Sequence, residues 1–140
     1  MRMARYSKEH SSKVETWVNS TTVGLSSTEL INHFETTLNK LWEKSSHQIS
    51  EVTLSAVMDR AIFTSSDTHK FMLELKLGPS GIRWDEFREK TTDLNRNELK
   101  RAFTYLITEF IVIFSNITGG ILTDTLYKTL LNIKPKKKQR

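Results

Sequence analysis

The side chains best suited to acid–base or metal chemistry in this 140-residue chain are four histidines that lie far apart in the sequence. They are His10, His33, His47 and His69. No two of them have the HxxxH spacing, and none has the HxxE spacing, that places two metal ligands on one helix face. His33 lies one position off the apolar stripe of a predicted helix and lacks the small residue and lysine expected a turn after a phosphotransfer histidine, so we interpret it as a residue at the core boundary. The sequence therefore predicts no metal site, and we expect no cofactor.

Carboxylates and nucleophiles give no stronger signal. Asp59 beside Arg60, and Asp85 beside Glu86, are typical of charged helix surfaces, and a pair of carboxylates alone does not define an acid–base dyad. The chain has no GxSxG motif, and it has no cysteine, which excludes disulfides, thiolate catalysis and zinc–cysteine sites. We assign no catalytic residue and expect a protein that is not an enzyme.

A double glycine, Gly119–Gly120, stands before the last predicted helix and invites comparison with a phosphate-binding loop. Such a loop needs a lysine and a hydroxyl where Leu122 and Thr123 stand, and it follows a β-strand, which this sequence does not predict there. A residue in the left-handed conformation commonly ends a helix, and glycine adopts that conformation most readily. We therefore predict that Gly119 caps one helix and that the corner is a hinge.

The elements that position these residues are mainly amphipathic helices, read from apolar residues at a 3.6-residue period. Ser26 with Glu29 and Asn95 with Glu98 predict helix starts, and Ser50 is a third candidate cap. Helices are expected over 26–44, 50–66, 95–118 and 121–133, with a short helix near 82–90. In the last helix, Thr123 is expected to face water.

Residues 67–77 are ambiguous, because Phe71, Leu73, Leu75 and Leu77 alternate with other residues as in a strand, while Asp67 could cap a helix. No second convincing strand is found in the sequence, so the segment is predicted as a helix or an extended surface segment. The two readings stay open.

The predicted fold is all-α: a compact bundle of four to five helices around a central buried helix that includes Leu99 to Ile117. Residues 1–25 are expected to form a short polar segment that is only partly ordered, with a short helix around Val14, Trp17 and Val18. Residues 26–133 form the helical bundle domain, and residues 134–140 form a disordered basic tail.

A run of five apolar residues, 110–114, suggests an interface. In a bundle of this size, either the other helices cover such a helix completely or a second subunit covers part of it. The second reading predicts a homodimer or a protein partner, and thus a signalling or regulatory adaptor. The interface residues proposed are Phe110, Ile111, Phe114, Leu126 and Leu130.

The formal net charge of +5 lies entirely in the C-terminal tail, because the other 16 basic residues balance the 16 acidic ones. The tail's basic residues are Lys134, Lys136, Lys137, Lys138 and Arg140. Three readings stay open: a solvated end, contact with nucleic acid or an anionic membrane, or a nuclear-localisation signal. Contact with nucleic acid through this tail is the alternative function.

The expected location is the cytoplasm, or the nucleus if the host is eukaryotic. The first 17 residues lack the apolar run of a signal peptide. The longest apolar region, Phe103 to Ile117, is shorter and more polar than the roughly 20 apolar residues that span a bilayer.

The C-terminal third, "ELKRAFTYLITEFIVIFSNITGGILTDTLYKTL", resembles helical modules of archaeal and bacterial signal-transduction proteins that accompany sensor histidine kinases and clock-type ATPases. In those modules a buried helix ends at a glycine, and an amphipathic helix of the form Gly-x-x-Leu-x-x-x-Leu follows. Gly119, Leu122 and Leu126 match this spacing. The resemblance implies a regulatory or dimerising module without catalysis.

Overall fold

A computed structural model describes residues 2–79 and 81–135 of the chain, with side chains from residue 8 onward. This part is mostly helical, as the all-α prediction requires, but it contains six α-helices rather than four to five. They are α1 (Arg2–Thr21), α2 (Ser27–Ser46), α3 (Glu51–Ser66), α4 (Asp85–Lys90), α5 (Arg96–Thr118) and α6 (Thr123–Leu131). A 3-10 helix, η1 (Lys70–Glu74), and a hairpin of β1 (Lys76–Gly78) and β2 (Gly81–Arg83) connect α3 to α4.

Three helices begin where the sequence predicted caps. Ser26 and Glu29 form a reciprocal capping box at the start of α2. Ser50 accepts a hydrogen bond from the backbone N–H of Thr53 at α3, and Asn95 accepts one from that of Glu98 at α5. These side chains satisfy backbone donors that a helix start leaves without intrahelical partners, and all three cap predictions are confirmed.

The N-terminal segment differs from the prediction, because α1 is a helix of 20 residues. Val14, Trp17 and Val18 are buried on one face of it, so the short predicted helix is part of a longer one. The helix continues to its threonine end, where the Thr21 hydroxyl donates to the carbonyl of Trp17. The chain then turns at Gly24, whose φ of 77° is one that glycine adopts readily.

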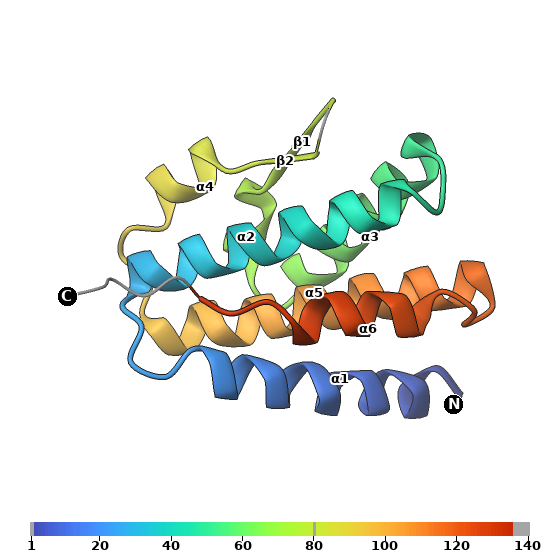
Figure 1. The fold of residues 1–140 in the computed structure, drawn as a ribbon. Coiled ribbons are helices and arrows are strands. Elements are labelled where there is room, and N and C mark those ends of the chain that lie inside the picture. The colour runs from blue at the N-terminus through green and yellow to red at the C-terminus, as the bar shows by residue number, and fades with distance from the viewer. Residues whose placement is uncertain (1, 80, 136–140) are drawn as a thin grey trace.

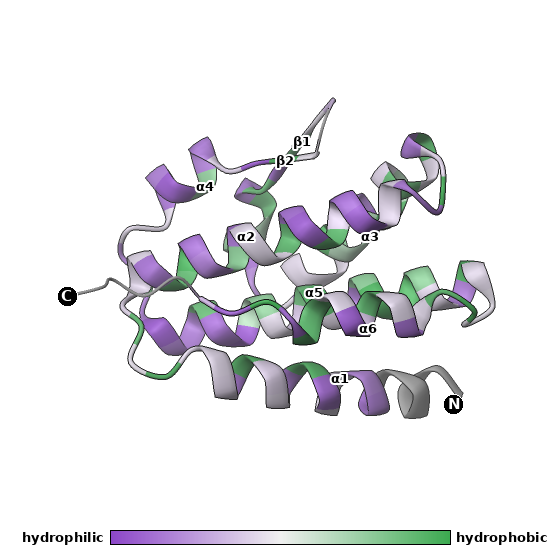
Figure 2. Cartoon of the chain, in the orientation of Figure 1, coloured by the Kyte–Doolittle hydropathy of each residue, from purple (hydrophilic) through white to green (hydrophobic). Residues whose placement is uncertain are grey.

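The arrangement in Figure 1 places α1, α2, α3 and α6 around α5, and each of these helices contacts it. Polar and apolar stretches alternate along α1 and α2 in Figure 2, as expected of helices that bury one face. Within the core, the Phe34 ring of α2 stacks on Phe103 of α5 with ring centroids 4.6 Å apart. None of the described helices is long and apolar enough to cross a membrane.

The segment after α3 corrects the prediction that no second strand exists. β1 pairs antiparallel with β2, with Leu77 opposite Ile82. Gly81 has a φ of 127°, and a Cβ at this position would lie 3.7 Å from the Trp42 ring of α2. A three-residue strand has too little hydrophobic pattern to be recognised alone, and the contact between β2 and α2 supports it.

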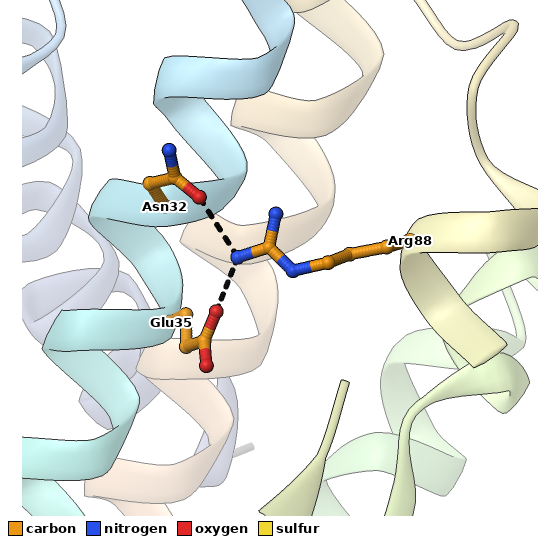
Figure 3. A network of polar contacts seen from close by, with 3 residues as sticks. All are labelled: Asn32, Glu35 and Arg88. Carbon is orange, nitrogen blue, oxygen red and sulfur yellow. Dashed lines mark hydrogen bonds and ion pairs between the residues drawn. The ribbon is translucent and has the colours of Figure 1, made fainter. Parts of the chain in front are cut away.

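The short helix α4 is anchored to α5 on its inner face and to α2 on its outer face. Phe87 points into the core and meets Phe103 edge-to-face with centroids 5.5 Å apart. On the outer side, the Arg88 guanidinium donates to the Asn32 side-chain oxygen at 2.8 Å and also forms an ion pair with Glu35 (Figure 3). Because both partners of this ion pair are partly exposed, it orients α4 more than it stabilises the fold.

Candidate interaction surface

The five residues predicted to form an interface lie inside the single chain. Each has an exposed fraction of at most 1%. They are Phe110, Ile111, Phe114, Leu126 and Leu130. The structure therefore corrects their assignment to the surface, because the chain's own helices cover them and no second subunit is needed to do so.

The helix that carries three of these residues is not covered on every side. Arg101 and Tyr105 are exposed, Glu109 and Ile113 are half-buried, and Ile117 is exposed near the end of α5. These positions recur every four residues, so one narrow stripe of α5 faces solvent. The inclusion of Ile117 in the buried run was wrong.

The basic tail lies mostly outside the described residues. Lys134 is described and exposed. Four of the predicted contact residues, Lys136, Lys137, Lys138 and Arg140, lie beyond residue 135.

The glycine corner has the predicted geometry. Gly119 has a φ of 67° in the left-handed region, and its N–H donates to the carbonyl of Ser115, so its prediction as the cap of α5 is confirmed. Thr123 was expected to face water but is buried, where its hydroxyl hydrogen-bonds that of Ser115. Two hydroxyls that satisfy each other can be buried, and the pair ties the start of α6 to the end of α5.

Two of the four histidines are buried, and each meets a different partner. His10 of α1 hydrogen-bonds the Tyr127 hydroxyl of α6, and Lys13 lies over the Tyr127 ring at 4.9 Å from its centroid. His33 is 3% exposed, which is deeper than the boundary position predicted for it. Among the described residues, no group of three or more His, Asp or Glu could hold a metal ion.

His33 is held as a neutral ring between α1 and α2. Its Nε2 lies 3.0 Å from the Thr21 hydroxyl oxygen, and its ring stacks on Trp17 with centroids 5.1 Å apart. The Thr21 hydroxyl already donates to a backbone carbonyl, so we assign the proton to Nε2 and let Thr21 accept it. Burial lowers the pKa of His33 to about 4, because a charged ring would lose its hydration.

The charged pairs behave as the sequence predicted: Asp59, Arg60, Asp85 and Glu86 are exposed. Among the carboxylates of the described residues, only Glu109 of α5 has a clearly shifted pKa. Burial raises its pKa, and the neighbouring Arg60 lowers it. The raised pKa is explained by burial alone and does not require a catalytic role.

A surface that the sequence reading missed lies between α3 and the hairpin. A groove of about 500 Å³ lies on the surface where α3 meets η1 and β1. We call this the α3–hairpin surface; its lining includes Ala56, Asp59, Arg60, Phe63, Leu73, Lys76 and Leu77. Phe63 is 63% exposed and Leu73 is 48% exposed, and clustered exposure of large apolar side chains is typical of interaction sites.

A signal for this surface was present in the sequence. The predicted stripe of α3 runs through Leu54, Val57, Met58, Ala61 and Ile62, all of which are buried. Val52, Ala56 and Phe63 lie off that stripe and share the opposite face of the helix. Apolar residues on the solvent side of an otherwise amphipathic helix mark a second contact face.

Comparison of the chain with models of protein families, with curated proteins and with solved structures gave no match.

Proposed function

We propose that this protein is a non-enzymatic helical interaction module that serves as a signalling or regulatory adaptor, and that it pairs with a second copy of itself through the α3–hairpin surface. The observation that carries the proposal is the exposure of the large apolar side chains of Phe63 and Leu73, which both line the groove between α3 and the hairpin. Buried aromatic side chains commonly dominate the binding energy of protein interfaces. The resemblance of the C-terminal third to dimerising signalling modules points the same way.

The charges around the groove suit a second copy. Asp59 and Arg60 are adjacent and exposed, so in a two-fold dimer Asp59 of each copy can approach Arg60 of the other. Lys76 also lines the groove, and Glu109 lies close enough to Arg60 for the two charges to interact. The surface is therefore close to neutral, and two copies can meet without strong repulsion.

Apolar burial supplies the affinity in this proposal. Complete burial of a phenylalanine side chain is worth about 1.5–3 kcal/mol, so covering the exposed 63% of two Phe63 rings contributes about 2–4 kcal/mol. At about 1.4 kcal/mol for each tenfold change, their loss weakens a dimer by at least about 25-fold.

Sedimentation equilibrium of the full chain at roughly 50 µM tests the proposal. In a monomer–dimer equilibrium the fraction of dimer, and with it the average mass in solution, rises with protein concentration. We expect a dimer for the unaltered protein and a monomer for Phe63→Glu. The matched control is Ile121→Glu, which places the same charge on an exposed apolar residue at the turn before α6. This variant is expected to remain a dimer.

A charge-reversal pair tests the geometry. Asp59→Arg alone is expected to weaken the dimer, and Asp59→Arg combined with Arg60→Asp is expected to restore it. A monomer at this concentration for the unaltered chain would refute self-pairing. Equal dissociation by Phe63→Glu and Ile121→Glu would show that the contact lies elsewhere.

A further inference from the structure

A second groove, independent of the α3–hairpin surface, lies between the C-terminal half of α1 and the segment that follows α6. Its volume is about 480 Å³. One wall is built from α1 and the turn after it, and the other from residues 131–135, which run back toward the α1–α2 turn in Figure 1. We call it the α1–C-terminal groove; its lining residues include Lys13, Trp17, Val23, Leu131, Ile133 and Lys134.

The two walls are held together by a buried tryptophan. The Trp17 indole N–H donates to the backbone carbonyl of Ile133 at 3.3 Å, and this bond fixes the segment after α6 against α1. On its other side the Trp17 ring stacks on the buried His33. The groove is therefore formed before anything binds, which lowers the entropic cost of binding.

The hydroxyl groups along the α1 wall have no hydrogen left to offer a ligand. Thr16 donates to the carbonyl of Ser12, and both Ser20 and Thr21 donate to the carbonyl of Trp17. The contacts left for an occupant on this wall are mainly apolar. At the rim, Val23 is 68% exposed and Leu131 is 60% exposed.

The charged side chains in the lining are Lys13 and Lys134, with no carboxylate among the described lining residues. The Lys13 ammonium is positioned over the Tyr127 ring, which places a cation at the groove. The residues that follow, Lys136, Lys137, Lys138 and Arg140, add further positive charge in the sequence. This charge makes the chain's own tail a poor occupant, because its lysines would meet Lys13 and Lys134.

We propose that the α1–C-terminal groove is the docking site for an acidic segment of a partner protein that also carries apolar side chains. Carboxylates of that segment pair with Lys13 and Lys134, and its apolar side chains cover Leu131 and Val23. The complementary charge and the concave shape favour a narrow peptide segment over a flat lipid surface.

The test uses a fluorescein-labelled peptide of about 14 residues, which is about four helical turns, composed of leucines at a helical spacing and glutamates elsewhere. Binding is followed by fluorescence anisotropy at about 0.1 M salt, where exposed charges still attract over about 10 Å. The protein is the full chain carrying Phe63→Glu, so that the α3–hairpin surface and any dimer do not contribute. The same peptide with lysine in place of glutamate is the charge control.

We expect the glutamate peptide to bind and the lysine peptide not to bind. Leu131→Glu and Lys134→Glu should each weaken binding at least about tenfold, as is usual for residues central to an interface. The matched controls are Ile121→Glu and Lys128→Glu, which place the same charge on exposed residues outside the groove. They should change the affinity by less than about twofold, since distant exposed substitutions act independently.

Several results would overturn the proposal. One is the absence of binding at about 1 mM peptide, which corresponds to an affinity too weak for a specific site. Another is equal weakening of peptide binding by the groove variants and by their controls. A third is complete loss of peptide binding when only residues 136–140 are deleted. Either result would show that the peptide binds through the overall positive charge of the protein and not through the groove. Groove-dependent binding of anionic phosphatidylserine vesicles that is stronger than peptide binding would assign the groove to a lipid surface instead.

Discussion

Acidification is expected to destabilise this protein through His33, the buried histidine between α1 and α2. Its Nε2 is paired with the Thr21 hydroxyl, while its Nδ1 is buried and has no hydrogen-bond partner among the described residues. A second proton would have to sit on Nδ1, which is buried and has no acceptor among the described residues to stabilise it. This is why burial lowers the pKa of His33 from 6.5 to about 4.

The sign and size of the effect follow from this pKa. The folded protein takes up the proton at His33 only near pH 4, whereas the unfolded chain takes it up near pH 6.5. Stability from this residue is complete above pH 6.5 and is lost as the pH falls to about 4. The difference between 6.5 and about 4, at about 1.36 kcal/mol for each pH unit, amounts to about 3 kcal/mol. This is a large part of the roughly 5–15 kcal/mol that stabilises most domains.

Urea unfolding followed by circular dichroism between about pH 7 and about pH 4 measures this effect. The comparison is between the unaltered protein and His33→Phe, which keeps an aromatic ring beside Trp17 but cannot titrate. The pKa values of His10 and His69 are also lowered by burial, and both proteins retain these residues, so the difference between the two curves isolates His33.

We expect the unaltered protein to lose about 3 kcal/mol more than His33→Phe over this range. His47→Gln, which alters an exposed histidine, is the control and should follow the unaltered protein. Parallel curves for the unaltered protein and His33→Phe would refute the reasoning, because they would show that His33 is protonated equally in the folded and unfolded chains.

Two further predictions concern the corner and the core. Gly119→Ala should lower the free energy of unfolding by about 1–2 kcal/mol in urea titrations, because φ at this position is 67° and a Cβ is strained there; an unchanged midpoint would contradict the role of Gly119 as a left-handed cap. Phe114→Ala should lower it by about 3–5 kcal/mol, whereas Leu131→Ala at an exposed position should change it by less than about 0.5 kcal/mol. If Phe114→Ala left the stability unchanged but changed the average mass of the protein in solution, Phe114 would have to lie at an interface between subunits.

The candidate surfaces could be predicted only in part, because exposure depends on which helices meet. The run Phe110 to Phe114 is apolar enough to suggest an uncovered face, and α1 is polar enough to suggest a loose segment. In the structure α1 packs against α5, so the segment that was expected to be loose covers part of the helix that was expected to be uncovered. The burial of α5 therefore depends on the length and position of α1. The few apolar residues of α1 predicted neither of these.

The sequence by itself determined the helical class, three helix caps and the left-handed end of α5, because each depends on neighbours within a few residues. Only the tertiary structure decided that β1 and β2 pair and that His33, Thr123 and Phe114 are buried within the single chain. These properties depend on residues that are distant in the chain. Burial is set by the sum of contacts from several helices, and the periodicity of one helix gives only its own contribution to that sum.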